Sequence, residues 1–344
     1  MHRFDWWLVL PTIILVLIGL LMLRSVAPNQ LVYQLVFILV SIAVFLLFSL
    51  TDYQLWFSLH LPIYAIAVSS LVLPFILGIS SRGVHRWLQF GSISVQPSEL
   101  AKPFLLITFA VLAASQIRHK QFWLLVAFLL PAIIIFLQPD LGTALVIAVG
   151  WATIFLPQVP KRLLGLGIVV VLLLAPLVWI TLRPYQKDRL ITFIDPYADP
   201  LDRGYQVIQS TMAVGSGQFW GRGLGQGPQS QLQFLPERQT DFMFAALAEE
   251  LGFVGAMTVL VTFGWLFYRI YYTAQVADNL PANFFSLAAV AMIAFQVFIN
   301  IGMNMGMAPV TGITLPLVSY GGSSLVSMAI TLGLVISINR RSRV

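Results

Sequence analysis

The chain has 344 residues, of which 59% are hydrophobic and only 9% are charged, whereas a soluble domain carries about 25% charged residues. This composition excludes a soluble globular protein and predicts an integral membrane protein. The absence of cysteine excludes disulfides and Cys-based metal sites. The net charge of +6 reflects basic residues at a membrane surface, so no nucleic-acid partner is expected.

Apolar runs of about 20 residues, the length that crosses a bilayer, recur along the chain. They predict an all-α polytopic membrane protein with about ten transmembrane helices. The predicted spans are residues 6–24, 31–50, 55–78, 99–117, 121–138, 140–157, 162–182, 242–268, 281–307 and 312–338. The first run is long enough to span and no A-x-A cleavage pattern follows it, so we expect a span there and not a signal peptide.

Basic residues in the short connections predict the orientation. The N-terminal side carries Arg3, Arg118, Lys120, Lys161, Arg162, Arg269, Arg340, Arg341 and Arg343. The short connections on the other side carry only Arg24, Arg82 and Arg86. Because cytoplasmic connections are enriched in Lys and Arg, we expect both termini in the cytoplasm. The long loop between spans seven and eight, about 183–241, is then extracytoplasmic.

The first outer loop with many polar residues, 78–99, precedes a predicted span whose first residues are polar. Its middle, Val84 to Phe90, is expected to form a short amphipathic piece on the surface. In QPSELAK, Pro97 suits the first helical position, and Glu99 and Lys102 share a helix face and can pair. A lysine one turn inside a span is costly. The pair is therefore either functional or a local neutralisation of the helix start, and both interpretations stay open.

Two further segments carry acidic residues at span starts. In QPDLGT, Asp140 is favoured as the N-cap of the next helix. In LPERQTDFMFAALAEELGFVG, Asp241 taken alone is also typical of an N-cap. Glu249 follows on roughly the same helix face, and Glu250 is turned away. We expect at least one of the two to pair with a basic group or to orient a neighbour.

Glycines and prolines shape two other segments. The run from Gly215 to Gly227 is glycine-rich and predicts a mobile or close-packed stretch. PVTGITLPLVSYGGSS, 309–324, interrupts an apolar region, and non-helical backbone at membrane depth is tolerated where it lines a cavity. The helix after it offers free N–H groups to a phosphate. The alternative is small-residue helix packing, also suggested by Gly302 and Gly306.

The sequence lacks the nucleotide-binding and zinc-binding motifs with which an enzyme could activate a substrate. No Gly-Lys-Ser/Thr occurs, so no P-loop is expected, and the four histidines are too scattered for a zinc site. A substrate of this protein would therefore arrive already activated.

Five motifs in order give the chain a family resemblance: RWLQFGSISVQPSELAK, QPDLGTA, RLITFIDPYADPLDRGYQVIQS, SQLQFLPERQTDFMFAALAEELGFVG and NMGMAPVTGITLPLVSYGGSS. The chain resembles the SEDS (shape, elongation, division and sporulation) proteins typified by RodA and FtsW. DPYADP and SQLQFLPER are closer to the RodA branch. The likeness covers nearly the whole chain, so residues 1–344 are expected to form one domain.

The resemblance implies a peptidoglycan glycosyltransferase with a role in rod shape and elongation. Such enzymes polymerise lipid II into β-1,4 glycan strands at the outer face of the bacterial cytoplasmic membrane. The implied partners are a class B penicillin-binding protein transpeptidase and other elongation-complex membrane proteins. The family's essential acid maps to Asp241, and its QPSE-x-x-K polar residues map to Glu99 and Lys102. Many relatives carry His where this chain has Gln239, so a role for that histidine does not apply here.

The reaction implied by the resemblance inverts the anomeric centre, which suits one displacement with one general base. Asp241 is predicted to be that base. A leaving diphosphate needs cations or N–H donors. The predicted substrate-binding residues are Arg86, Glu99, Lys102, Arg189, Arg203, Thr240, Ser319, Gly321, Gly322, Ser323 and Ser324. The predicted supporting residues are Asp140, Glu237, Glu249 and Glu250. A divalent cation, Mg or Mn, would suit the diphosphate, but the sequence does not require one.

Two other functions remain alternatives. The first is a lipid II flippase or other transporter, and the second is a non-catalytic scaffold for cell-wall synthases. Transporters tend to place polar sites near the bilayer midplane, whereas most of the polar candidates here fall at the outer ends of predicted spans. That distribution favours the enzyme.

Overall fold

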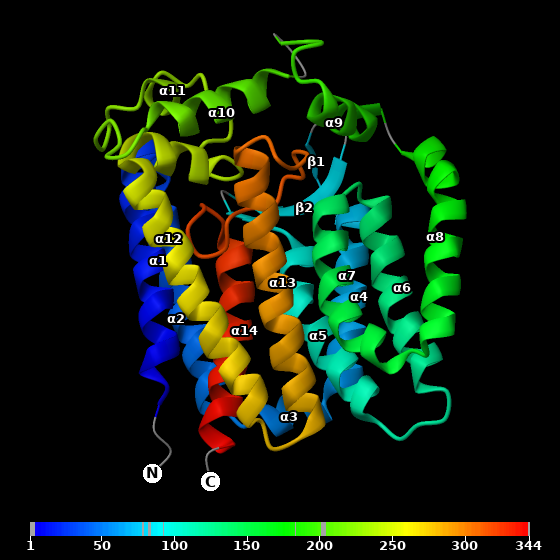
Figure 1. The fold of residues 1–344 in the computed structure, drawn as a ribbon. Helices are drawn as coiled ribbons and strands as arrows, with labels where there is room; N and C mark the ends of the chain where they lie inside the picture. The colour runs from blue at the N-terminus through cyan, green and yellow to red at the C-terminus, as the bar shows by residue number, and fades with distance from the viewer. Residues whose placement is uncertain are drawn as a thin grey trace.

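A computed structural model describes residues 4–77, 79–81, 84–91, 93–182, 184–200 and 204–342. The molecule is a bundle of long helices (Figure 1). Within the described residues, nine helices are long and apolar enough to cross a membrane. These are α1 (Trp6–Val26), α2 (Leu31–Leu50, after the 3-10 turn Pro28–Gln30), α4 (His60–Leu77), α5 (Pro97–Ala114), α6 (Lys120–Leu137), α7 (Leu141–Phe155, followed by the 3-10 turn Leu156–Gln158), α12 (Met243–Val276), α13 (Leu280–Asn304) and α14 (Gly322–Arg341).

The remaining predicted span, 162–182, is the 21-residue helix α8 (Lys161–Thr181), which stands at the edge of the bundle (Figure 1). The predicted all-α polytopic membrane fold is therefore confirmed. The short helix α3 (Tyr53–Ser58) precedes α4 and accounts for the start of the predicted span 55–78.

Burial differs strongly between the helices of the bundle. In α14, 89% of the most apolar window is buried, and in α5 the share is 67%, whereas it is only 17% in α2 and α4. The helices α14 and α5 therefore form the centre, and α2 and α4 form part of the rim. The rim helices expose large apolar side chains such as Leu39 and Ile66, and such a surface fits a lipid environment.

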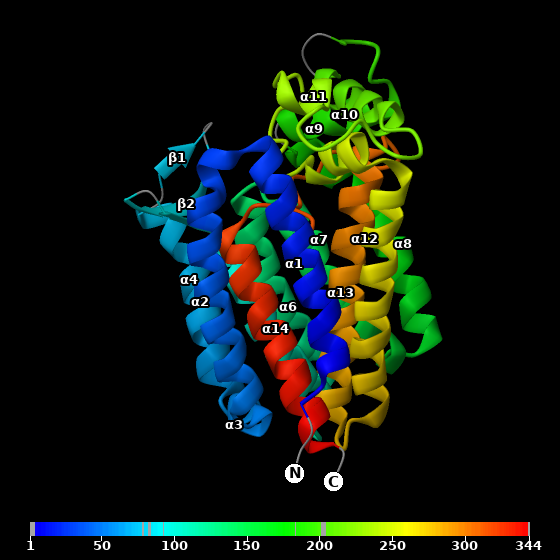
Figure 2. The same cartoon turned by 90° about the vertical axis from the view of Figure 1, so that its left-hand side faces the viewer.

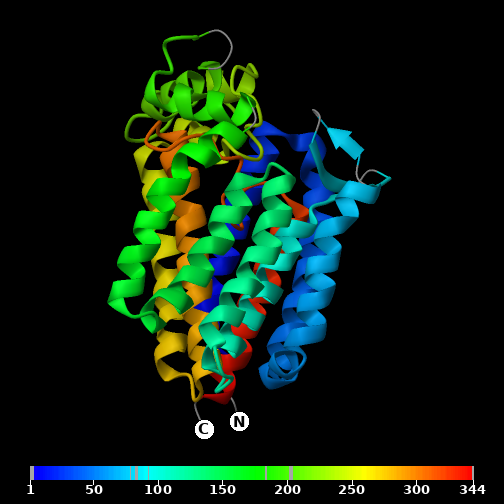
Figure 3. The same ribbon diagram turned by 90° about the vertical axis from the view of Figure 1, so that its right-hand side faces the viewer.

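Polar elements gather at one end of the bundle. A small antiparallel sheet consists of β1 (Ile79–Ser81), β2 (Val84–Phe90) and β3 (Ile93–Val95), with Ile79 opposite Trp87 and Leu88 opposite Val95. The segment 84–90, predicted as an amphipathic surface piece, is thus a strand. The long loop forms its own helices α9 (Pro184–Ile194), α10 (Tyr205–Ser216) and α11 (Pro228–Gln231). Figures 2 and 3 show the sheet and α9–α11 on opposite sides of this end.

The opposite end of the bundle holds the start of α1 and the end of α14 (Figure 1). The two ends of the described chain therefore lie on one side, as the predicted number of crossings requires. Which side faces the cytoplasm remains a prediction from the distribution of basic residues.

The helix α12 is broken near its start. At 34 residues an unbroken helix would be about 51 Å long, well beyond the roughly 30 Å hydrocarbon core. Gly252 has φ 65° and ψ −163°, which interrupts the helix. The linker after α10 closes on this break, because a Cβ at Gly217 or Gly221 would lie within 2.2 Å of the Ala248 or Glu250 carbonyl oxygen. The glycine-rich stretch is therefore close-packed here.

The segment before α14 is irregular. The predicted span 312–338 is wrong in its first part, because α14 begins only at Gly322. Residues 312–321 are non-helical, with positive φ at Gly312 and Leu317. The predicted helix-packing glycines also differ from expectation. Gly306 lies beyond the end of α13 with φ 73°, and a Cβ added at Gly302 would lie 3.3 Å from the Ala308 Cβ of the following turn.

Candidate functional site

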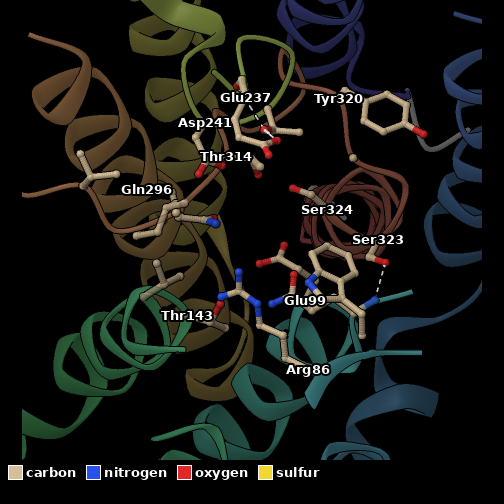
Figure 4. Close-up of a pocket in the computed structure, with 18 of the residues that line it drawn as sticks. Arg86, Glu99, Thr143, Glu237, Asp241, Gln296, Thr314, Tyr320, Ser323 and Ser324 are labelled. Carbon is tan, nitrogen blue, oxygen red and sulfur yellow. Dashed lines mark hydrogen bonds between the residues drawn. The ribbon is translucent and has the colours of Figure 1, made fainter. Parts of the chain in front are cut away.

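A cavity of about 700 Å³ lies at the end of the bundle that carries the sheet and α9–α11. Segments far apart in sequence form its wall, including β2, the starts of α5, α7 and α14, and the turn before α12 (Figure 4). Ten predicted site residues line it: Arg86, Glu99, Arg189, Glu237, Thr240, Asp241, Gly321, Gly322, Ser323 and Ser324. Most of the predicted site residues therefore line one cavity.

Five predicted residues do not line this cavity. They are Lys102, Asp140, Glu249, Glu250 and Ser319, and each of them is buried. Arg203 lies outside the described residues. The roles proposed for the five must therefore be exerted through neighbouring groups.

Asp241 lies in a turn just before α12 and does not cap that helix. The N-cap residue is Phe242, and no side chain caps the helix start, so the N-cap interpretation of Asp241 is wrong. The Thr240 and Phe242 backbone N–H groups both donate to the Glu237 carbonyl, at 3.0 and 3.3 Å, which closes the turn. Figure 4 shows Asp241 directed into the cavity from the same side as Glu237 and Thr314.

Two asparagines of α13 fix the backbone of Asp241. Asn300 Nδ2 and Asn304 Nδ2 each donate to the Asp241 carbonyl at 3.0 Å. Asn300 also donates to the Ile313 carbonyl at 2.7 Å, and Asn304 Oδ1 accepts from the Ala245 N–H at 2.9 Å. Both asparagines are 0% exposed. One face of α13 therefore ties together the turn, the first helical turn of α12 and the irregular segment 312–321.

The carboxylate of Asp241 differs from the neighbouring polar groups in its hydrogen bonding and its pKa. Within the described part of the chain, no hydrogen bond to its side-chain oxygens is made. Burial raises the pKa of Asp241 from its usual 3.8 to about 6; the positive charge of Arg189 opposes this rise, and Glu237 adds to it. A Cβ placed on Gly312 would be 3.7 Å from both Arg189 Nη1 and Asp241 Oδ2, so these two groups converge on that glycine.

The wall opposite Asp241 contains a buried ion pair. Glu99 lines the cavity, and its Oε2 lies 2.7 Å from Lys102 Nζ, which confirms the predicted pairing. Lys102 is 2% exposed and does not line the cavity. Arg86 extends from β2 on the same side as Glu99 (Figure 4). The cavity thus has Asp241 on one wall and Arg86 together with Glu99 on the other (Figure 4).

Asp140 has the structural role that the sequence favoured. It is the N-cap of α7, and its Oδ1 accepts from the Thr143 N–H at 3.2 Å. Its Oδ2 accepts from Gln96 Nε2 at 2.7 Å and from Thr143 Oγ1 at 2.9 Å. Asp140 therefore joins the starts of α5 and α7 directly behind the wall.

Ser319 joins the irregular segment to the Asp241 turn. Its Oγ donates to the Thr240 carbonyl at 2.6 Å and accepts from the Leu315 N–H at 3.0 Å. The Tyr320 N–H donates to the Gln239 carbonyl at 2.9 Å. These bonds position the start of α14, which opens into the cavity with Gly321 to Ser324.

Glu249 and Glu250 bind the long loop and not the cavity. Glu249 Oε1 and Oε2 accept from the backbone N–H groups of Gln229 and Ser230 at 2.8 and 2.9 Å. Glu250 accepts from Ser25 Oγ at 2.6 Å and from Gln231 Nε2 at 2.9 Å. No ion pair of either carboxylate is present among the described residues. Their partners are backbone and neutral groups, so the expectation that one of them orients a neighbour fits better than pairing with a cation.

Several polar residues of the cavity were not predicted as site residues from the sequence: Gln96, Thr143, Asp188, Thr192, Gln206, Gln296, Thr314 and Tyr320. Thr143 belongs to QPDLGT, a motif already singled out. Gln296 carried a usable signal, because it is a polar residue within a predicted span and such residues are costly in a bilayer.

A metal ion has little support from the protein side chains alone. Among the described residues, no three His, Asp or Glu side chains come together to hold one. A divalent cation would need oxygen ligands from the substrate together with a carboxylate such as Asp241. The cation therefore remains a prediction.

Comparisons with known proteins agree with the geometry. The family model of the FtsW, RodA and SpoVE cell cycle proteins matches residues 5–344. The peptidoglycan glycosyltransferase MrdB of Escherichia coli K12 is 39% identical over 284 residues, which cover 80% of this chain and 76% of MrdB.

Solved structures are similar over the whole chain. A chain from a structure of a peptidoglycan synthase complex that coordinates polymerization and crosslinking is 35% identical, with a TM-score of 0.85 and coverage of 100% of this chain and 99% of that one. The rod shape determining protein RodA of Thermus thermophilus is 29% identical, with a TM-score of 0.74 and coverage of 99% and 98%. The chain belongs to the FtsW/RodA/SpoVE family, the SEDS proteins.

Proposed function

We propose that this protein is a peptidoglycan glycosyltransferase that uses lipid II as donor and acceptor. Family membership and a relative named for this activity support the reaction class. The absence of a P-loop in the sequence also fits, because lipid II carries its own diphosphate leaving group.

The observation that carries the proposal is Asp241 with its raised pKa in a polar cavity. An ordinary aspartate is a weak base, and a pKa near 6 makes proton acceptance more favourable while the group stays mostly ionised at neutral pH. The 4-hydroxyl oxygen of one sugar attacks the anomeric carbon of the other. The bond from that carbon to the diphosphate breaks, and the diphosphate leaves with the electron pair. Asp241 accepts the hydroxyl proton.

Arg86 and Arg189 are the cations suited to the leaving diphosphate. Both line the cavity, and both positive charges act on Asp241. Charge developing on the diphosphate is stabilised by fixed cations in a site of low dielectric constant. The start of α14 adds N–H donors from Gly322 to Ser324, and Glu99 holds Lys102 in place behind the wall.

The location of the cavity suits a lipid-linked substrate. It opens at the end of the bundle away from the start of α1 and the end of α14. The distribution of basic residues predicts that this end faces outward from the cytoplasmic membrane. Both lipid tails can then stay in the bilayer while the sugars meet at its surface. The family match to residues 5–344 supports treating residues 1–344 as one domain.

A class B penicillin-binding protein is the proposed partner, because it would crosslink the strands that this protein makes. The similarity to a chain of a peptidoglycan synthase complex supports such an assembly. A role in elongation follows from the likeness to RodA and MrdB. The other elongation-complex membrane proteins remain part of the same proposal.

The experiment is to supply lipid II to the purified protein and resolve the products by gel electrophoresis. The wild type should form glycan polymer, and Asp241→Asn should form it about 10²–10⁴ times more slowly if Asp241 is the base. Near-wild-type polymerisation by this variant would remove Asp241 from the role of base. If vesicles with the protein moved labelled lipid II across the bilayer and no polymer formed, the protein would be a transporter.

A further inference from the structure

One buried polar side chain of the cavity has no hydrogen-bond partner among the residues that the structure describes. Gln296 on α13 is 2% exposed and lines the cavity. Among the described residues, none makes a hydrogen bond to its side-chain amide. Figure 4 shows the amide end directed into the cavity, between Asp241 and Arg86 in that view. A buried amide without hydrogen-bond partners costs free energy, and a polar residue within a membrane span is a functional candidate.

The same face of α13 offers an internal contrast. Asn300 lies one helical turn, about 5.4 Å, further along α13, and Asn304 follows one turn later. Both asparagines have partners at their side-chain amides: Asn300 donates to two carbonyls, and Asn304 both donates and accepts. On this face of α13, the amides of Asn300 and Asn304 therefore hold other segments in place, whereas the amide of Gln296 faces the cavity.

The chemistry of the amide selects the group that it would bind. Gln296 has a donor, Nε2, and an acceptor, Oε1. A phosphate oxygen would satisfy only Nε2 and leave Oε1 without a donor. An N-acetylated sugar has an acetamido carbonyl and neighbouring ring hydroxyls, so it can satisfy both ends. The cations Arg86 and Arg189 already supply charge for a diphosphate.

We propose that Gln296 recognises the acetamido group of the sugar held beside Asp241, with Nε2 donating to the acetamido carbonyl and Oε1 accepting from a ring hydroxyl. This inference rests on the proposed function and adds a specificity-determining residue to it. Asn300 contacts the Asp241 carbonyl one turn away. Asp241 and Gln296 line the same cavity of about 700 Å³.

The test compares wild type and Gln296→Met on two substrates. One is natural lipid II, and the other is lipid II with a hydroxyl in place of the acetamido group. A separate analogue is made for each of the two sugars, so that the experiment identifies which sugar is recognised. The wild type should prefer natural lipid II over one analogue by on the order of 10-fold in kcat/KM, the size of one hydrogen bond left unmade. Gln296→Met should lose most of this preference.

Unfolding temperature supplies a readout that is independent of activity. Gln296→Met should be as stable as the wild type or more stable, because it removes an amide that has no partner in the fold. Asn300→Leu is the matched control on the same face and should lower the unfolding temperature, since it removes the side-chain donor to the Ile313 carbonyl and one of the two asparagine donors to the Asp241 carbonyl.

Three results would overturn the inference. If Gln296→Met were destabilised as strongly as Asn300→Leu, the amide would be structural. If the variant lost the same factor on natural lipid II and on both analogues, Gln296 would not recognise the acetamido group, and the proposed function would still stand. If the wild type polymerised no lipid II at all, the proposed function would fail, and the inference with it.

Discussion

Asp241 and the pair Glu249 and Glu250 lie within one short stretch of sequence but differ in how their carboxylates are satisfied. Glu249 and Glu250 accept hydrogen bonds from backbone amides, a hydroxyl and a side-chain amide of the surrounding chain. Asp241 has its backbone carbonyl held by two asparagines, while its side-chain oxygens accept no hydrogen bond within the described residues. The first two carboxylates stabilise the fold, and the third faces a cavity.

This difference separates two reasons for placing a charge at a membrane boundary. A buried carboxylate that accepts several hydrogen bonds connects segments, as Glu249 connects α12 to α11. A carboxylate that is buried facing a cavity, as Asp241 is, has a pKa raised by that burial, which suits proton transfer. Asn300 and Gln296 differ in the same way on α13.

Glu99 both faces the cavity and is paired within the fold, and its substitution should cause the largest change in stability. It lines the cavity and also pairs with buried Lys102. Glu99→Gln should destabilise the protein by about 3–5 kcal/mol, because it leaves a buried lysine uncompensated. The double variant Glu99→Gln, Lys102→Met should regain most of this stability in thermal unfolding. Polymerisation should stay low in the double variant if Glu99 acts on the substrate. Recovery of both properties would make the pair purely structural.

Glu249→Gln tests the satisfied carboxylates. A glutamine keeps one acceptor and presents an NH₂ group to a backbone N–H, so we expect a loss of about 1–3 kcal/mol in the free energy of unfolding. Limited proteolysis should cut the segment 226–232 faster than in the wild type. Glu237→Gln is the matched control, because it is the same substitution at a carboxylate that lines the cavity. Proteolysis of the segment 226–232 should not change in this control. Unchanged stability and proteolysis in Glu249→Gln would remove the structural role of Glu249.

The dependence of stability on pH tests the raised pKa of Asp241. Because burial raises the pKa of Asp241 to about 6, its neutral form is favoured in the folded state. Its contribution to stability is therefore complete below about pH 4 and is lost as the pH rises through 6. The unfolding temperature of Asp241→Asn relative to wild type should increase between pH 4 and pH 7. A difference that stays constant with pH would contradict the raised pKa.

The polymerisation rate gives a second view of the same ionisation. The wild-type rate should rise with pH through about 6, as Asp241 becomes the ionised base. The residual rate of Asp241→Asn should lack this rise. A wild-type rate that falls over the same range would contradict the assignment of Asp241 as a base.

The sequence predicted the spans well, because a bilayer demands long apolar runs whatever their neighbours are. It failed where long-range packing decides the local structure. The glycines and prolines of 309–324 predicted an interruption of the helix. They did not predict that all of 312–321 would be irregular or that Ser319 would bind the Thr240 carbonyl. Asp241 was interpreted as an N-cap because aspartate is common at that position. Only the fold shows that α12 begins without a side-chain cap.

The candidate site shows the same limit. Arg86, Glu99 and Asp241 were predicted because charges near a bilayer are rare and informative. Lys102 and Ser319 were predicted as substrate contacts, but the structure places both behind the wall of the cavity. Gln296 was overlooked among apolar neighbours, since sequence alone does not tell which face of α13 meets the cavity.

The central claim is that Asp241 acts as the general base of the reaction, whereas Glu249 stabilises the fold. The most direct test measures the polymerisation rate per folded molecule and the unfolding temperature of Asp241→Asn and Glu249→Gln at pH 7. We expect Asp241→Asn to lose about 10²–10⁴ in rate with an unfolding temperature equal to or above that of the wild type. We expect Glu249→Gln to unfold at a lower temperature and to keep a rate within a few-fold of wild type. An Asp241→Asn variant that polymerises lipid II at near the wild-type rate would contradict the claim.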